Sequence, residues 1–168
     1  LRESLAGFAY ELSPAAFFQT NPAAAESLVS EAVRLLAPQE GEVVWDLYCG
    51  VGAFSFPLAA SGAKVVGLEA NSAAVADARH NAALNNLEDC VFLDGDAGML
   101  LRKGLPGEFA RPDAVLADPP RAGLHPNVVA ALLRFKPARI LLVSCHLATL
   151  ARDLGALSKA YVPRAVQG

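Results

Sequence analysis

The sequence predicts an α/β fold in which a largely parallel sheet carries helices on both faces. Apolar runs of strand length alternate with segments of helical length along the 168 residues, which is typical of repeated βα units. Hydrophobic residues make up 54% of the chain and charged residues 18%, which excludes disorder and indicates mostly buried elements. The run Ile140-Leu141-Leu142-Val143 does not alternate with polar residues, as expected for a strand covered on both faces.

The elements follow one another at regular intervals. We expect strands at Glu42–Leu47, Ala63–Leu68, Cys90–Leu93, Asp113–Ala117 and Arg139–Ser144, and covering helices at Pro22–Leu36, Ala53–Ala60, Ser72–Asn85, Asn127–Phe135 and Leu147–Leu157. Asn21 and Asn71 precede two of these helices, and an Asn oxygen can cap the free amides of a first helical turn. Pro22 suits such a turn because its missing N–H would have no partner there.

The length fits one domain with a single core and is too short for two domains of ordinary size. The longest uncharged stretch, residues 47–63, is interrupted by glycines and a proline, so it predicts strand, loop and helix, and we expect no membrane span. The chain begins with Leu1 and lacks the pattern of a signal peptide. We therefore expect it to be part of a longer protein.

Charge is distributed unevenly along the chain. Residues 1–98 hold four Lys or Arg against thirteen Asp or Glu, whereas residues 99–168 hold ten against four. The basic C-terminal part is either a solvated surface or a binding surface for a polyanion.

The three cysteines are Cys49, Cys90 and Cys145, an odd number without a Cys-x-x-Cys pair. This argues against a disulfide framework, and against a zinc or iron–sulfur site in this segment, so no metal is expected. It indicates a reducing compartment, which we take to be the cytoplasm.

In parallel sheets the ligand lies beyond the carboxyl ends of the strands. After the first strand, Gly50 and Gly52 allow a tight turn and close backbone approach to a ligand, although a plain tight turn is also possible. Ser55 stands where a dinucleotide-binding motif has its third glycine, which disfavours a pyrophosphate ligand. Glu69 ends the second strand, 19 residues after Gly50, where its carboxylate can accept hydrogen bonds from both ribose hydroxyls of an adenosine.

Charged and nucleophilic residues follow the remaining strands. Asp96 could hold an adenine amino group or cap the next helix. Asp118 begins the segment Asp-Pro-Pro-Arg, whose Arg121 offers a planar fork for a phosphate or a base. Cys145 lies between a buried strand and a helix start, where helix amides and Arg121 or His146 would favour a reactive thiolate. Cys49 and Cys90 lack that setting, so we interpret them as packing residues.

Four segments, in this order and spacing, resemble one family. They are Phe17-Phe18-Gln19-Thr20-Asn21-Pro22, Asp46-Leu47-Tyr48-Cys49-Gly50-Val51-Gly52, Asp118-Pro119-Pro120-Arg121-Ala122-Gly123 and Ser144-Cys145-His146-Leu147-Ala148-Thr149-Leu150-Ala151-Arg152-Asp153. They resemble the S-adenosylmethionine-dependent RNA uracil-5 methyltransferases, which make 5-methyluridine in transfer or ribosomal RNA. The resemblance covers about residues 8–158 and implies a Rossmann-like class I methyltransferase fold.

By this resemblance, the cofactor is S-adenosylmethionine, the partner is RNA, and Cys145 is the nucleophile, which we group with Arg121 as catalytic. Cofactor-site positions fall on the glycine loop and five other residues, namely Gln19, Tyr48, Glu69, Asp96 and Asp118. Carbon 5 of uracil becomes nucleophilic when a thiolate adds to carbon 6. The resemblance places the base that removes the carbon-5 proton beyond Gly168 and RNA-binding regions before Leu1, so residues 1–168 alone are expected to be inactive.

Other functions remain open at this point. Methyltransferases for an amino group typically carry Asn-Pro-Pro-Tyr at the fourth strand end, which Asp118 and Arg121 do not match. A cytosine-5 methyltransferase also uses a thiol, but the run from Ala148 to Asp153 favours the uracil family. A nonenzymatic cofactor-binding or RNA-docking module is the alternative from a different class. The sequence leaves open which RNA and which uridine are involved, and the oligomeric state.

Overall fold

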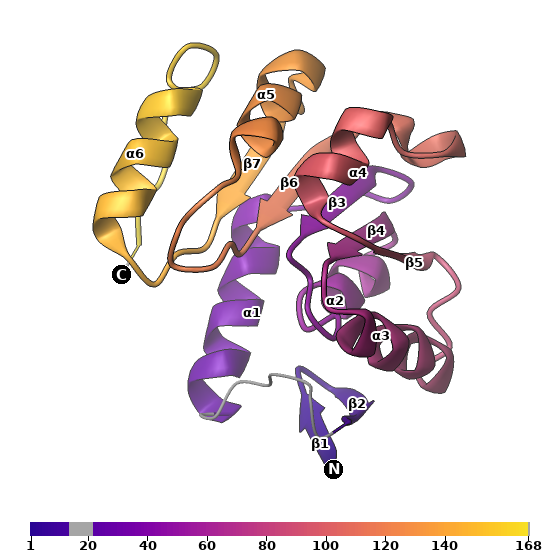
Figure 1. The fold of residues 1–168 in the computed structure, drawn as a ribbon. Coiled ribbons are helices and arrows are strands. Elements are labelled where there is room, and N and C mark those ends of the chain that lie inside the picture. Colours follow the sequence, from indigo (N-terminus) through magenta and orange to yellow (C-terminus); the bar gives the residue numbers. More distant parts are fainter. Residues whose placement is uncertain (14–21, 168) are drawn as a thin grey trace.

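The computed structural model describes residues 1–13 and 22–167 (Figure 1). Its elements are β1 (Arg2–Leu5), β2 (Phe8–Glu11), α1 (Pro22–Leu36), β3 (Val43–Leu47), α2 (Ser55–Ala60), β4 (Lys64–Glu69), α3 (Ser72–Leu84), β5 (Cys90–Asp94), α4 (Ala97–Lys103), the 3₁₀ helix η1 (Gly107–Ala110), β6 (Ala114–Ala117), α5 (Pro126–Phe135), β7 (Arg139–Leu142) and α6 (Leu147–Leu157). Strands β1 and β2 form a separate antiparallel hairpin.

The main sheet has the strand order β5-β4-β3-β6-β7, and all four of its pairings are parallel. The predicted α/β fold with a parallel sheet is therefore confirmed. The chain order reverses at β3, which pairs with β4 on one side and with β6 on the other. In such sheets the crevice at the reversal point, outside the carboxyl ends of the strands, is the usual ligand site.

Helices cover both faces of the sheet because successive strand residues point to opposite sides. On β3, Val44 packs in the core that contains residues of α1, α2 and α3, whereas Trp45 packs in the core with α4, α5 and α6. The Trp45 ring meets Phe135 edge-on at 5.2 Å, and its Nε1 donates to Phe109 O at 2.9 Å. Both cores are apolar, so the sheet divides the single core expected from the length into two. The run Ile140-Leu141-Leu142-Val143, which was expected to be covered on both faces, is only partly buried, because β7 is an edge strand of the described sheet.

The predicted bounds agree with the structure to within two residues. Helices α1 and α6 have the predicted bounds, and Asn71 caps α3 by accepting from the amides of Ala73 and Ala74. Strand β7 ends at Leu142, two residues before the prediction, and α5 begins one residue earlier, with Pro126 in its first turn. The predicted cap at Asn21 lies outside the described residues.

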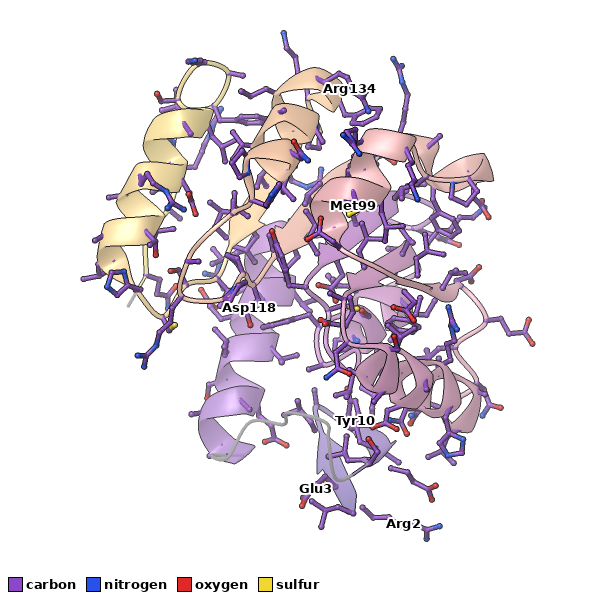
Figure 2. The ribbon with its side chains drawn as sticks, in the orientation of Figure 1. Arg2, Glu3, Tyr10, Met99, Asp118 and Arg134 are labelled. Carbon is purple, nitrogen blue, oxygen red and sulfur yellow. The ribbon has the colours of Figure 1, made fainter. Side chains whose placement is uncertain are left out.

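The hairpin, which the sequence reasoning did not predict, depends on polar contacts between distant segments. The hairpin docks on α3, where Asn85 bonds both backbone groups of Ala9, Asn81 bonds both of Glu11, and Asp77 accepts from the Ser13 amide at 2.8 Å. These side chains form hydrogen bonds with the edge of β2 that does not pair with β1. Tyr10 stacks on Phe56 with ring centroids 5.2 Å apart, which joins the hairpin to the core. Figure 2 labels Tyr10 at the hairpin.

Residues 47–63 form the end of β3, a loop and α2, as their glycines and proline predict. Within the described part of the chain, no helix is long and apolar enough to cross a membrane.

Candidate functional site

Polar residues gather at the carboxyl edge of the main sheet. The strand register places Leu47 beside Leu68 and Ala117, and Glu69 beside Asp94, so the loops after β3, β4, β5 and β6 start side by side. Figure 2 marks Asp118 where β6 ends at this edge. The edge brings together the predicted residues Tyr48, Gly50, Gly52, Glu69, Asp96, Asp118, Arg121 and Cys145.

The loop after β3 has a backbone conformation that favours glycine. Gly50 and Gly52 have φ angles of 55° and 91°, and Tyr48 has φ 64°, which is unusual for a residue with a side chain. A Cβ atom at Gly52 would lie 2.8 Å from Phe56, which leaves no room for a side chain there. A Cβ at Gly50 would meet no described atom within 4 Å, so this side of the loop is open to a ligand.

Glu69 holds the loop in place. One of its carboxylate oxygens accepts from the Gly50 amide at 3.0 Å, and the other accepts from the Asn71 amide at 2.8 Å. An ionised carboxylate has about four acceptor sites, so each oxygen retains capacity for a ligand hydroxyl. The structure thus gives Glu69 a scaffolding role that the sequence did not indicate and leaves it able to bind a ribose.

Asp46 lies beneath the loop and was not among the predicted site residues. It is fully buried, and its Oδ2 accepts from the Ser55 hydroxyl at 2.5 Å, whereas its Oδ1 has no hydrogen-bond partner among the described residues. Burial raises its pKa to about 7, and the nearby charges of Asp118 and Glu69 act in the same direction. Its position at the head of the glycine motif was the signal that could have identified it.

Asp96 and Tyr48 join neighbouring loops. Asp96 accepts from the Met99 amide at 2.8 Å and caps α4, which is the second interpretation considered for it. The Tyr48 hydroxyl accepts from the His125 amide at 3.3 Å, at the start of α5. Burial raises the pKa of Tyr48, so it is a neutral phenol at neutral pH. These bonds link the loops after β3 and β6 and fix the start of α4 after β5.

Asp118 begins the loop after β6 and is half-buried. Its amide donates to Leu47 O at 3.3 Å, which anchors the loop to β3. Burial raises the pKa of Asp118 to about 6, so it is mostly ionised at pH 7. Its charge therefore stands close to the crevice at the reversal point of the sheet.

Cys145 differs from the other two cysteines in exposure. Cys145 is exposed just before α6, whereas Cys49 and Cys90 are buried in the core, and burial raises the pKa of both of these thiols. The interpretation of Cys49 and Cys90 as packing residues agrees with this burial. His146, next to Cys145, caps α6 with its Nδ1 accepting from the Thr149 amide at 3.4 Å. Only one of the three thiols is therefore presented to solvent.

Arg121 is exposed in the loop that follows Asp118. The predicted cofactor residue Gln19 lies outside the described residues. Arg152 and Asp153 bind the loop that contains Arg121. The sequence analysis used them only as part of a motif of the family, because their contacts join segments about thirty residues apart.

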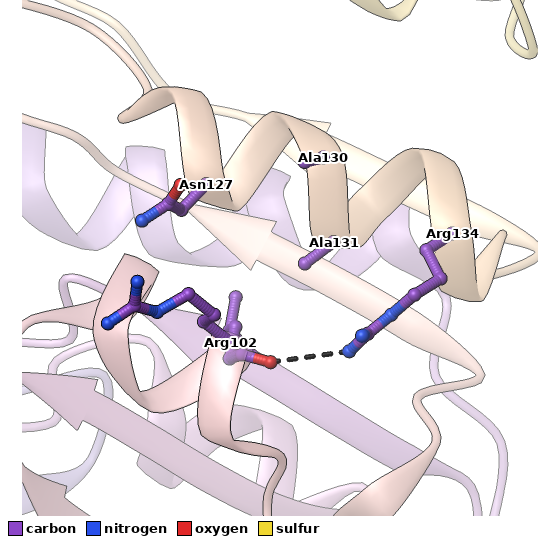
Figure 3. Close-up of a pocket in the computed structure, with 6 residues that line it drawn as sticks. Arg102, Asn127, Ala130, Ala131 and Arg134 are labelled. Carbon is purple, nitrogen blue, oxygen red and sulfur yellow. Dashed lines mark hydrogen bonds between the residues drawn. The ribbon is translucent and has the colours of Figure 1, made fainter.

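A separate hollow of about 120 Å³ lies between α4 and α5, lined by Leu101, Arg102, Asn127, Ala130, Ala131 and Arg134 (Figure 3). Arg134 Nη2 donates to Leu101 O at 3.3 Å beside this hollow, which joins the two helices. Other basic residues of the C-terminal part are paired internally, Arg139 with Glu42 and Arg152 with Asp153. Part of the basic charge of this region therefore serves structural contacts.

The edge fits S-adenosylmethionine in its chemistry. This cofactor carries a positive sulfonium and ammonium group and a ribose with two hydroxyls. Glu69 and Asp118 present carboxyl groups around the loop, and Asp46 lies buried beneath it with an Oδ1 that has no partner among the described residues. No group of three or more His, Cys, Asp or Glu suited to a metal ion occurs within residues 1–13 and 22–167.

This strand order and this loop define a class I S-adenosylmethionine-dependent methyltransferase fold. Solved structures agree: a precorrin-6y C5,15-methyltransferase of Geobacter metallireducens superposes with a TM-score of 0.72 over 90% of this chain and 76% of that chain. Its sequence identity is 19%, so this similarity shows the fold alone.

The family model of tRNA (uracil-5-)-methyltransferases matches residues 4–97 and 106–165. The chain belongs to this family. It is similar to the tRNA (uracil-54, C5)-methyltransferase of Pyrococcus abyssi, solved with S-adenosyl-L-homocysteine, with 39% identity and a TM-score of 0.81 over 94% of this chain and 37% of that chain.

Other similar proteins are described as RNA methyltransferases. An uncharacterized RNA methyltransferase of Nitratidesulfovibrio vulgaris is 44% identical over 163 residues, which are 96% of this chain and 35% of that protein. One of Clostridium tetani is 37% identical over 167 residues, covering 99% of this chain and 36% of the relative. The chain therefore spans about a third of the length of these relatives.

Proposed function

We propose that residues 1–168 are the S-adenosylmethionine-binding catalytic domain of an RNA methyltransferase that methylates carbon 5 of a uridine through a covalent adduct with Cys145. The observation that carries this proposal is the exposure of Cys145 at the edge where the glycine loop and the carboxylates lie, while Cys49 and Cys90 are buried. Membership of the family supports the reaction type, and transfer or ribosomal RNA is the expected substrate.

The cofactor supplies an electrophilic methyl group when it is bound. We assign its ribose to Glu69, whose Oε2 already accepts from the Gly50 amide of the loop, and its positive charges to the negative charge of Asp118 and to the carboxyl group of Asp46 beneath the loop. Asp96 lies after β5, where an adenine amino group would meet it, and Tyr48 borders the same loop. Gln19 is assigned to the cofactor site by the resemblance alone.

Cys145 performs the covalent step. Its thiolate adds to carbon 6 of uracil, which forms a C–S bond and moves electron density to carbon 5 and the carbonyl oxygen. Carbon 5 then bonds to the methyl carbon as the bond between that carbon and the sulfonium sulfur breaks. A general base takes the carbon-5 proton, and the electron pair left behind expels the Cys145 thiolate. Arg121 offers hydrogen bonds to a phosphate or to the base during these steps.

Trapping with fluorinated RNA tests the proposal. Fluorine at carbon 5 cannot leave as the proton does, so RNA containing 5-fluorouridine should remain bonded to Cys145 of the full-length protein after methyl transfer. Peptide mass spectrometry should locate the adduct on the peptide that contains Cys145. An adduct on a different residue would remove Cys145 from the nucleophile role, and turnover without any adduct would favour another chemistry.

A further inference from the structure

An ion pair joins helix α6 to the loop after β6. Arg152 and Asp153 are neighbours on α6, and the Nη2 and Nε atoms of Arg152 lie 2.7 and 3.0 Å from Asp153 Oδ1. The Asp153 residue is 4% exposed, whereas the Arg152 side chain is 56% exposed. A carboxylate is thus held inside the protein by a guanidinium at its surface.

The pair bonds the backbone on both sides of Gly123. Arg152 Nη2 donates to Ala122 O at 2.7 Å, and the Leu124 amide donates to Asp153 Oδ2 at 2.8 Å. Gly123 has φ 80°, and a Cβ there would collide with Arg152 Nη2 and Asp153 Oδ2. The Gly123 amide also donates to Pro120 O at 2.8 Å, which closes the turn that contains Arg121. The loop and the pair therefore fit each other without spare room.

Stability alone is a poor explanation for this arrangement. Burying a carboxylate costs free energy, and a well-packed apolar group often replaces a buried ion pair without loss of stability. The pair instead gives the loop one specific position, because a carbonyl and an amide are bound at the same time. Helix α6 begins two residues after Cys145, so the helix that binds the Arg121 loop also starts next to the thiol.

We propose that Arg152 and Asp153 are positioning residues that set the location of Arg121 relative to Cys145 for attack on the uracil ring. This inference rests on the proposed function. Neither residue is assigned a contact with the cofactor or with RNA. Loss of the pair is expected to slow formation of the covalent adduct while cofactor binding persists, because Asp118 is anchored separately to Leu47 on β3.

The test uses the full-length protein with the variants Arg152→Lys and Asp153→Asn and the exposed control Arg164→Gln. The Arg152→Lys change keeps the positive charge, but an ammonium group cannot bond Ala122 O and Asp153 together in the geometry of a guanidinium. We expect Arg152→Lys to lower kcat and the rate of adduct formation with 5-fluorouridine RNA by about 10- to 100-fold, as a small misplacement of reacting groups does. Its KM for tRNA or rRNA from cells lacking the gene, and its calorimetric Kd for S-adenosylhomocysteine, should change less than about threefold.

A double variant separates positioning from general damage. If the pair acts through the Arg121 loop, Arg152→Lys should cost at least about threefold less activity in an Arg121→Ala background than in the wild type. Equal losses in both backgrounds would overturn the inference. The inference would also be overturned if cofactor affinity and the thermal unfolding midpoint fell in parallel with the activity. The same criterion applies if Asp153→Asn fails to fold.

The two proposals fail in different ways. A wild-type protein that methylates uridine and forms the adduct, together with an equally fast Arg152→Lys variant, would overturn the positioning role alone. A wild-type protein that forms no adduct would overturn the proposed function and the positioning role with it.

Discussion

The two halves of the carboxyl edge are built differently. After β3, β4 and β5, the polar side chains bond the backbone: Glu69 accepts from two amides, Asp96 caps α4, and Tyr48 accepts from His125. After β6 and β7, Arg121 and Cys145 are exposed, and the order of their loops comes from α6. In one half the polar side chains themselves bond backbone amides, and in the other the loops are held by a helix that comes later in the chain.

This difference matches the sizes of the two proposed ligands. A small cofactor is bound best by a site that is already formed, because little entropy is lost when it binds. A base within RNA has to be unstacked and turned outward before a thiol can reach its ring, so the nucleophile has to be accessible. Under the proposed function, the exposed Cys145 thiol and the hydrogen-bonded Glu69 would serve the same reaction.

The largest effect is expected at the exposed thiol. Cys145→Ala in the full-length protein should reduce methyl transfer to background, because no other described thiol is exposed, and should leave cofactor binding nearly unchanged. Cys49→Ala is the matched control and should retain most of the activity. A radiolabelled methyl-transfer assay with both variants decides it, and robust turnover by Cys145→Ala would contradict the contrast between the two halves.

The buried carboxylate of Asp46 should make stability depend on pH. Burial raises its pKa to about 7, so between about pH 4 and pH 7 the folded protein retains a proton that the unfolded chain releases, and stability falls as pH rises through this window. Asp46→Asn lacks this charge. The free energy of urea unfolding of this variant, relative to that of the wild type, should increase by on the order of 2–4 kcal/mol as the pH rises from 4 to 8. A difference that is constant over this range would show that Asp46 stays ionised.

Glu69 should matter chiefly for the cofactor. Loss of a charge-assisted acceptor typically costs about 1.5–3 kcal/mol, so Glu69→Ala should weaken S-adenosylhomocysteine binding by roughly 10- to 150-fold. The exposed Glu88→Ala is a control that keeps the same change of charge. Calorimetry that finds equal affinity for wild type and Glu69→Ala would remove the ribose-acceptor role.

The smallest effect is expected at the α4 cap. Asp96→Ala removes the bond to the Met99 amide and should lower the free energy of unfolding by about 1 kcal/mol. Asp94→Ala, two residues away at an exposed position, should change it by less than about 0.5 kcal/mol. Equal effects of the two substitutions would show that the cap does not hold the helix.

Much of the fold and of the edge could be predicted because the signals are local. Apolar runs locate the strands, and parallel strands bring their carboxyl ends together, so Gly50, Glu69 and Asp118 were predicted correctly to share one edge. The family prediction is confirmed by the match over residues 4–97 and 106–165. The roles assigned to individual side chains at the edge stay predictions.

What could not be predicted depends on contacts between distant segments. The hydrogen bond between Asp153 and Leu124 joins segments 29 residues apart, and the hairpin is bonded to α3 across 70 residues and more. Asp46 heads the glycine motif, which was a usable signal, but its burial and its unpaired oxygen are not visible in the sequence.

The docking of β2 on α3 has a consequence for the length of the hairpin. Asp77 and Asn81 on α3 and its C-cap residue Asn85 follow one another every four residues, a rise of about 6.0 Å per step. They meet every second residue of β2 and of the extension that follows it, a rise of about 6.6 Å. The two spacings are nearly commensurate, but the mismatch adds up, and each step also turns the helix side chains by about 40°. Side-chain pairing of this kind holds register for only a few steps, so lengthening β2 would add residues whose backbone groups the helix could not reach.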